Sequence, residues 1–126
     1  MSSDSELSIG RGLEGKRIIV TGASSGIGKA IALLLERVGA SVIAIGLDQG
    51  RLSQLAGEFS DPSRRLTLSV DLSTESCAEE IMEPAITRFG GVDAVILAGA
   101  TLRRRDLKDV TVTDWDYQLD TNLRST

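Results

Sequence analysis

The fold of this chain is decided by the stretch Val20-Thr21-Gly22-Ala23-Ser24-Ser25-Gly26-Ile27-Gly28, which separates an apolar run from a helical pattern. The apolar run that leads into it is typical of a buried β-strand. After it, apolar residues recur every three or four positions, as one buried helix face requires: Ile27, Ala30, Ile31, Leu34, Leu35 and Val38. The stretch therefore predicts a strand over 16–21, a glycine turn, and a helix over 25–38 that ends at Gly39.

A strand that runs through a glycine turn into a helix N-terminus forms a site for anions. Free backbone N–H groups and the positive end of the helix dipole point into the turn. Glycines let a pyrophosphate approach the backbone or let helix and strand cross closely, and Ser24 and Ser25 add hydroxyl donors. Ser25 also stands at the N-cap position. The predicted dinucleotide-binding residues are Gly22, Ser24, Ser25, Gly26, Ile27 and Gly28. A glycine-rich turn that binds no ligand is the alternative.

The rest of the chain alternates strand patterns with helical patterns. Further strands are predicted over 41–45, 65–70 and 93–98, and further helices over 49–59, over 74–89 and from 113 onward. Thr113 and Asp116 have the spacing of a capping box at the start of the last helix. This alternation predicts an α/β fold with a Rossmann-type parallel sheet in the strand order 3-2-1-4, an incomplete doubly wound fold.

Composition divides the chain and excludes several functions. Residues 1–12 are polar, without the apolar region of a signal peptide, and predict a disordered N-terminal tail. Residues 13–126 predict one NAD(P)-binding Rossmann domain, truncated within its fourth helix. The net charge of -4 argues against nucleic acid as a partner, and the absence of histidine removes His-based triads and most zinc sites, so no metal site is expected.

Two further features of the sequence concern the location of the protein. No apolar stretch has the length of a membrane span, so no membrane association is expected. The single cysteine, Cys77, cannot form an internal disulfide, and this favours a cytoplasmic location.

The spacing of the glycines differs from the commonest dinucleotide fingerprint, Gly-x-Gly-x-x-Gly. Thr21-Gly22-x-x-x-Gly26-Ile27-Gly28 instead resembles the nucleotide-binding turn of the short-chain dehydrogenase/reductase family. The resemblance implies an NAD(P)-dependent oxidoreductase that transfers a hydride between the nicotinamide and a small alcohol or ketone. It also implies a homo-oligomer at full length.

Two later segments resemble the same family. Asp71 and Leu72 follow the predicted third strand, where the family has an acidic residue that contacts the adenine ring. A turn aspartate is the alternative for Asp71. Residues 97–100 take the place of the family's Asn-Asn-Ala-Gly element, with both asparagines missing. The small residues there still allow the cofactor to approach the backbone: Ala98, Gly99 and Ala100.

The segment from Arg103 to Asn122 resembles the fourth helix, and the link before it, of family members that act on sugar acids, such as gluconate and 2-keto-3-deoxygluconate dehydrogenases. Asn122 matches the asparagine that holds a water in the family's proton relay, so it is the one predicted catalytic residue. The apolar stripe expected beside it consists of Trp115, Leu119 and Leu123.

The family's catalytic serine and its Tyr-x-x-x-Lys pair have no counterpart in the 126 residues. A phenol needs a neighbouring cation to act as a base at neutral pH, and the only tyrosine, Tyr117, has Thr121 four residues later. The chain alone is therefore expected to be the inactive, cofactor-binding half of a larger enzyme.

Cofactor choice depends on the residues after the second strand. Gly46 stands where many NAD-dependent members have Asp, and Leu47 stands where NADP-dependent members often have Arg. Asp48 lies 20 residues after Gly28, close to the interval expected for a ribose-binding acid. Leu47 and Asp48 are therefore predicted at the cofactor, and NAD is favoured over NADP, although Arg51 keeps NADP open.

Three hypotheses of function remain. The first is the oxidoreductase. Residues 103–105 are three arginines in the loop after the fourth strand, and they could attract an anionic substrate. A solvated loop is the alternative for these arginines. The second is a non-catalytic nucleotide-binding or interaction module. The third is an altered family member that acts as a scaffold, because the strand-four asparagines are missing.

Overall fold

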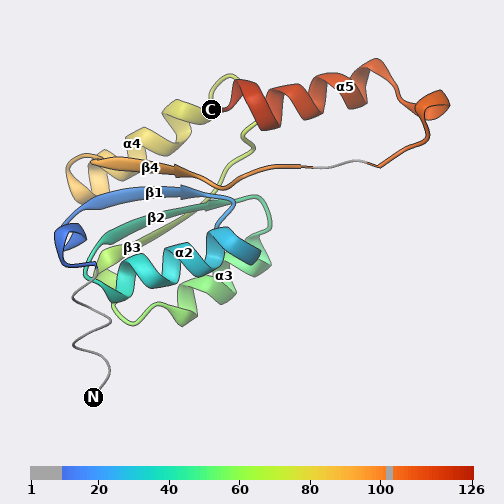
Figure 1. Cartoon of the computed structure of the whole chain (residues 1–126). Helices are drawn as coiled ribbons and strands as arrows, with labels where there is room; N and C mark the ends of the chain where they lie inside the picture. The colour runs from blue at the N-terminus through green and yellow to red at the C-terminus, as the bar shows by residue number, and fades with distance from the viewer. Residues whose placement is uncertain (1–9, 102–103) are drawn as a thin grey trace.

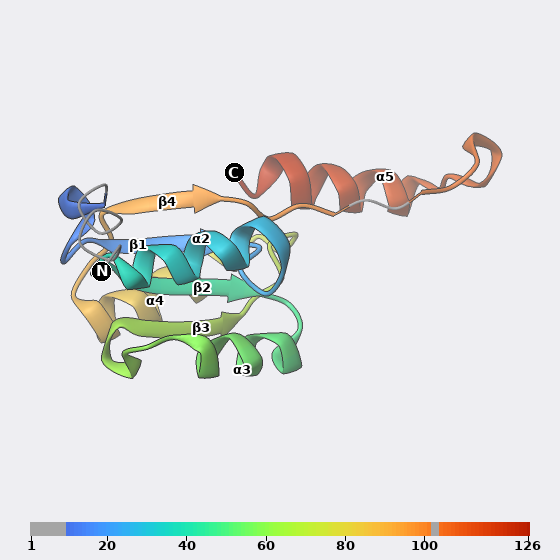
Figure 2. The same ribbon diagram turned by 60° about the horizontal axis from the view of Figure 1, so that its bottom comes forward.

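The computed structural model describes residues 10–101 and 104–126 of the chain. In these residues four parallel strands form one sheet: β1 (Arg17–Thr21), β2 (Ser41–Gly46), β3 (Arg65–Ser69) and β4 (Ala94–Leu97). Figure 2 shows them side by side in the order β3-β2-β1-β4. This is the predicted Rossmann-type order, so the fold prediction is confirmed.

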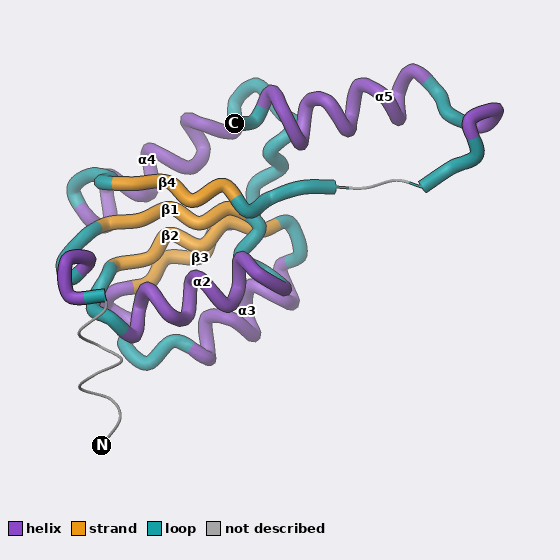
Figure 3. The backbone as a smooth tube through the Cα atoms, in the orientation of Figure 1, coloured by secondary structure: helices purple, strands orange, loops and turns teal. Residues whose placement is uncertain are grey.

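Helices cover both faces of the sheet. As Figure 1 shows, α2 (Gly26–Arg37) and α3 (Gln49–Glu58) lie on one face, and α4 (Cys77–Phe89) lies on the other. The last helix, α5 (Val112–Leu119), extends beyond the carboxyl ends of the strands and continues as a π-helical turn, Asp120–Arg124. Figure 3 shows the strands enclosed between the helical layers, with α5 outside them.

The central strands β1 and β2 are buried on both faces, which explains their unbroken apolar runs. One set of alternating side chains packs against α2 and α3: Ile18, Val20, Val42 and Ala44. The other set packs against α4: Ile19, Ile43 and Ile45. Because the sheet is held from both sides, the carboxyl ends of its strands are fixed relative to one another.

Three helix boundaries follow from local hydrogen bonds. Gly39, with φ +100°, ends α2, and the Ala40 N–H donates to the carbonyl of Leu35 at 3.0 Å. The capping box of the last helix lies two residues earlier than predicted, because Thr111 and Asp114, rather than Thr113 and Asp116, form it, and the helix begins at Val112.

The start of α4 is the third boundary. It lies at Cys77 instead of residue 74, because the chain first forms a turn in which the Thr74 N–H donates to the carbonyl of Asp71 at 3.3 Å. The Ser73 N–H also donates a hydrogen bond to the Asp71 side chain in this turn.

The N-terminal boundary also differs from the prediction. Gly10 is buried, and a Cβ placed on it would lie 2.7 Å from the Val38 side chain. Arg11–Leu13 form a 3-10 turn. Gly10, predicted as tail, therefore packs on the domain, while residues 1–9 of the predicted tail lie outside the described residues. None of the helices in the described part of the chain has the length and hydrophobicity that crossing a bilayer requires.

An ion pair joins the starts of β1 and β4. Arg17 Nε lies 3.0 Å from Asp93 Oδ2 and Arg17 Nη2 lies 3.2 Å from Asp93 Oδ1. The Arg17 backbone N–H also donates to Asp93 Oδ2 at 2.8 Å. The Arg17 guanidinium and backbone N–H together lower the pKa of Asp93 to about 2.

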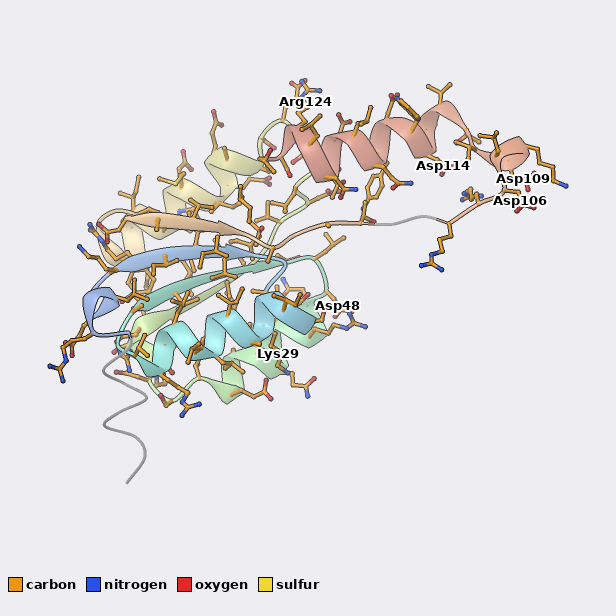
Figure 4. All side chains as sticks on the ribbon, viewed as in Figure 1. Lys29, Asp48, Asp106, Asp109, Asp114 and Arg124 are labelled. Atoms are coloured by element: carbon orange, nitrogen blue, oxygen red, sulfur yellow. The ribbon has the colours of Figure 1, made fainter. Side chains whose placement is uncertain are left out.

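Asp93→Asn is expected to destabilise the chain at neutral pH, by an amount that fades in acid. The carboxylate has a folded-state pKa of about 2, below its unfolded value of about 3.9. Its contribution is therefore complete above that unfolded value and is lost as the pH falls through the folded pKa. Urea unfolding of wild type and variant at several pH values from neutral to acid measures this convergence. Asp106→Asn, on the loop before α5 (Figure 4), is the exposed control. A difference that does not change with pH would contradict the ion-pair origin.

Candidate cofactor-binding site

A cleft of about 400 Å³ opens at the carboxyl ends of the strands. The glycine turn, the residues after β2 and β3, the segment after β4 and one face of α5 contribute to it. Its lining residues are Gly22, Ser24, Ser25, Ile27, Gly28, Ile45, Gly46, Leu47, Val70, Asp71, Leu72, Ala98, Gly99, Ala100, Thr101, Tyr117 and Thr121. Most of the predicted site residues therefore lie around one cleft, while Gly26, Asp48 and Asn122 are not among its lining residues.

Two glycines of the turn are required by packing. Gly22 has φ +64°, and a Cβ on it would lie 2.5 Å from the carbonyl oxygen of Ala98. A Cβ on Gly28 would overlap the carbonyl group of Gly22. These glycines therefore let α2 and the segment after β4 approach the turn closely.

Gly26 and Ser25 have a different role at the start of α2. Gly26 has φ +59°, and the space beside it is open, so its backbone conformation, rather than packing, favours glycine. Ser25 occupies the N-cap position, but its side chain accepts no capping hydrogen bond, so the predicted capping role is wrong. The exposed Ser25 side chain faces the cleft instead.

Thr21 braces the segment after β4. Its buried Oγ1 accepts hydrogen bonds from the N–H groups of Ala98, at 3.1 Å, and Gly99, at 3.0 Å. A Cβ on Gly99 would lie 2.9 Å from a Leu72 methyl group. The family's strand-four asparagines are missing, yet this segment is held against β1. Sequence reasoning missed Thr21, and its place next to Gly22 in the motif is the only signal that could have found it.

Asp48 is not positioned for the cofactor as the sequence suggested. Its Oδ1 accepts from the Arg51 N–H at 3.0 Å and so caps α3. Figure 4 shows Asp48 at the start of that helix. Asp48 directly follows Leu47 as the N-cap of α3, and its carboxylate binds the backbone of that helix and is not among the cleft-lining groups. Leu47 does line the cleft, and its carbonyl accepts from Ser69 Oγ at 2.9 Å.

Asp71 lies at the cleft and also shapes its turn. Asp71 Oδ1 accepts from the Ser73 N–H at 2.9 Å and from Ser73 Oγ at 2.7 Å. These two bonds lower the pKa of Asp71 below its ordinary value. Both interpretations of the residue, turn aspartate and cleft carboxylate, are therefore compatible with its position. It is the one carboxylate among the cleft-lining residues of the described chain.

Asn122 fastens the π-helical turn to the segment after β4. Its Oδ1 accepts from the Thr101 N–H at 2.8 Å, and its Nδ2 donates to the Thr101 carbonyl at 2.9 Å. The two bonds hold the turn after α5 beside the cleft-lining Thr101, and the role of Asn122 with a water stays a prediction. Thr121, which the sequence did not single out, lines the cleft, and its buried Oγ1 has no partner in the described part of the chain.

The charges around the cleft suit a dinucleotide. The positive end of the α2 dipole faces it, with Ser24 and Ser25 beside it. No lysine or arginine stands among the lining residues of the described chain. The described part of the chain contains no group of three or more His, Cys, Asp or Glu side chains that could hold a metal ion.

Comparison with known proteins identifies the family. The family model described as short chain dehydrogenase matches residues 16–126. An uncharacterized oxidoreductase of Staphylococcus epidermidis is 33% identical over 111 residues, which are 88% of this chain and 47% of the relative. The chain belongs to the short-chain dehydrogenase family, and it spans about half the length of the relatives it matches.

Solved structures agree with this assignment. A short chain dehydrogenase from Burkholderia cenocepacia in complex with NADP superposes with a TM-score of 0.82 at 31% identity, over 90% of this chain and 47% of that one. A 3-ketoacyl-(acyl-carrier-protein) reductase from Brucella melitensis complexed with NADH gives 0.79 at 31% identity, over 90% and 46%.

Proposed function

We propose that this chain is the cofactor-binding part of an NAD(P)-dependent oxidoreductase, which transfers a hydride between the nicotinamide and a small alcohol or ketone. The supporting observation is that one cleft is lined by the glycine turn, the α2 N-terminus and the ends of three other strands. Two similar solved proteins hold NADH and NADP, respectively. The α2 N-terminus with Ser24 and Ser25 would bind the pyrophosphate, and Asp71 would bind the adenine.

The finer parts of the proposal concern cofactor and substrate. NAD is preferred modestly, because the lining residues that the structure describes include no cation to bind a 2′-phosphate. A sugar acid is the proposed substrate class, supported by the arginines before α5. Arg105 pairs with Asp114 at 3.0 Å, which leaves the exposed Arg104 to attract an anion; Arg103 lies outside the described residues.

Two further parts concern assembly and location. A homo-oligomer is supported by the exposure of the predicted apolar stripe on and after α5: Trp115, Leu119 and Leu123. A cytoplasmic location is supported by the single cysteine. We also propose that the chain consists of an N-terminal tail followed by one dinucleotide-binding domain.

A non-catalytic nucleotide-binding module is the second candidate. Tyr117 lines the cleft but has Thr121, and no lysine, four residues later. Histidine is absent from the whole sequence. Among the residues that the structure describes, no side chain is therefore placed to exchange a proton with a substrate hydroxyl at neutral pH.

The test is binding and turnover by the purified 126-residue chain. Calorimetry is expected to show binding of NAD, and Gly26→Val is expected to weaken it at least tenfold, or about 1.4 kcal/mol. Gly57→Val, beside open space in α3, is the control. No NADH production is expected with a panel of sugar acids and small alcohols. Unchanged affinity in a folded Gly26→Val protein would remove the dinucleotide proposal, and sustained turnover would refute the inactive-half proposal.

Asp71→Ala is expected to weaken binding of ADP-ribose about tenfold and to leave binding of nicotinamide mononucleotide unchanged. The reason is that the carboxylate would accept a hydrogen bond from the adenine amine. Ser73→Ala, which removes the turn hydroxyl and keeps the carboxylate, is the control. Equal losses for both ligands, measured by calorimetry, would mean that Asp71 acts only through its turn.

A further inference from the structure

Strand β3 lies at one edge of the sheet, as Figure 2 shows, and in the described part of the chain it pairs only with β2. The Val70 N–H, just after β3, donates to the Gly46 carbonyl at 3.0 Å. The backbone groups of successive residues in a strand point to opposite sides, so those of Arg65, Thr67 and Ser69 point away from β2. This side of β3, the free edge, therefore presents donors and acceptors to a further strand.

A groove of about 760 Å³ lies between β3 and α4, beside the free edge. Its apolar lining consists of Leu66, Leu68 and Val70 from the β3 side and Pro84 from α4. Leu66 and Leu68 are only half-buried, although both pack against the core cluster beneath α4. A strand added at the free edge would remove more of these two side chains from water, which is favourable.

Opposite charges stand at the two ends of the groove. Glu80 and Glu83 line it from the first half of α4, and Arg88 lines it from the last turn; all three are exposed. Since β3 and β4 are parallel, the helix between them runs back along β3, so Glu80 lies toward the end of β3 and Arg88 toward its beginning. Arg88 Nη2 also donates to the Pro62 carbonyl, directly before β3, at 3.1 Å. The groove is therefore acidic at one end and basic at the other.

A second copy of the chain fits the free edge when it is related to the first by a two-fold axis through Thr67. Antiparallel pairing of two β3 strands about this axis sets Thr67 opposite its own copy, with the outward backbone groups of both residues facing each other. It also sets Leu66 of each copy opposite Leu68 of the other, on the face that α4 covers. Such cross-strand pairs stabilise a sheet, and here they would close both grooves together.

The same rotation makes the charges complementary. Pro84 lies midway between Glu80 and Arg88 along α4, so a two-fold axis beside it brings Glu80 of each copy toward Arg88 of the other. Any exposed strand could pair with the free edge, but only a partner with the opposite order of charges matches this groove. A second copy, turned by the two-fold axis, has that order.

We propose that a second copy of this chain occupies the groove, through antiparallel pairing of the two β3 strands across a two-fold axis. Every contact then occurs twice, and the two Glu80–Arg88 contacts oppose the repulsion expected between chains of net charge -4. The interface is independent of the proposed function, because neither the cross-strand pairs nor the charge pair uses a residue that lines the cofactor cleft. It is also separate from the apolar stripe on and after α5.

The charge pair is tested by sedimentation equilibrium of the 126-residue chain. Glu80→Arg and Arg88→Glu each place like charges at both symmetric contacts, and each is expected to weaken self-association at least tenfold. An equimolar mixture of the two variants should associate nearly as well as the wild type, because each contact between unlike copies again joins opposite charges. Glu79→Arg, at an exposed position of α4 outside the groove lining, is the control with the same charge change. A mixture as weak as the single variants, or an equal loss in the control, would overturn the inference.

Thr67→Pro tests the strand pairing. It removes an N–H that points away from β2, so the hydrogen bonds within the sheet are kept while pairing at the free edge loses its central donor. Self-association is expected to weaken at least tenfold. Thr67→Val, which keeps the N–H, should associate as the wild type does. A folded Thr67→Pro protein with wild-type association would overturn the inference, and if this variant does not fold, the mixture of charge variants decides.

Two further outcomes would also overturn the inference. A wild type that stays monomeric at every concentration would mean that no second copy occupies the groove, and would favour a strand of a different protein. Association that all the groove variants retain, but that Leu119→Ser abolishes, would assign the assembly to the apolar stripe on and after α5.

Discussion

Gly28→Ala is expected to lower the free energy of unfolding by about 3 kcal/mol and to abolish measurable dinucleotide binding. The added Cβ would overlap the carbonyl of Gly22, and since that group belongs to the backbone it cannot rotate away as a side chain can. Helix α2 would have to move away from the turn, and its N-terminal N–H groups would leave the position that an anion occupies. Urea unfolding and calorimetry with NAD measure the two effects.

Gly57→Ala is the matched control for this substitution. It adds the same methyl group near the end of α3, where the space is open. Because alanine is a better helix former than glycine, its stability should be unchanged or higher by up to about 1 kcal/mol. A Gly28→Ala protein with wild-type stability and affinity would contradict the close packing of α2 on the turn.

Glu36→Ala is expected to destabilise the chain by about 3 kcal/mol. Glu36 is 1% exposed near the end of α2, and its Oε1 accepts from Ser60 Oγ at 2.6 Å and from the Asp61 N–H at 2.7 Å. Arg64 Nη2 lies 3.7 Å from the same oxygen. Removal of the carboxylate would leave these donors without their acceptor and would disconnect α2 from the segment that leads into β3.

Glu58→Ala provides the comparison for this second variant. The Glu58 carboxylate lies 2.8 Å from Lys29 Nζ, but both side chains are substantially exposed to solvent. Such a surface pair contributes less than about 1 kcal/mol. Urea unfolding of both variants at neutral pH separates the two cases, and equal losses would show that burial does not govern the contribution of Glu36.

The sequence predicted the alternation of strands and helices, the strand order and most of the cleft, because each has a local signal. The 3.6-residue period of α2 and the apolar runs of β1 and β2 report the burial of single elements. Helix boundaries were less predictable where two nearby residue pairs could each form the capping box. Thr111 with Asp114 and Thr113 with Asp116 have the same spacing, and only the position of the helix selects the first pair.

The roles of individual site residues were the least predictable. The spacing from Gly28 favoured Asp48 at the ribose, but its carboxylate is taken by the cap of α3. Asn122 matched a family position, but its contact with Thr101 links residues 21 positions apart. The Asp48 cap is local, whereas the Asn122 contact depends on how elements pack, and the sequence carries no signal of that contact in its spacing.

By itself, the sequence determined that a strand runs through a glycine turn into a helix N-terminus in a parallel α/β domain. This information is local, since the glycines, the apolar run and the helical period are contiguous in the chain. Only the tertiary structure decided why Gly22, Gly28 and Gly46 are glycines. Each would meet an atom from another part of the fold: the carbonyl of Ala98, the carbonyl of Gly22 and the Cβ of Ser24, respectively. Close approach between segments is a property of packing, so it appears only when the strands and helices are assembled.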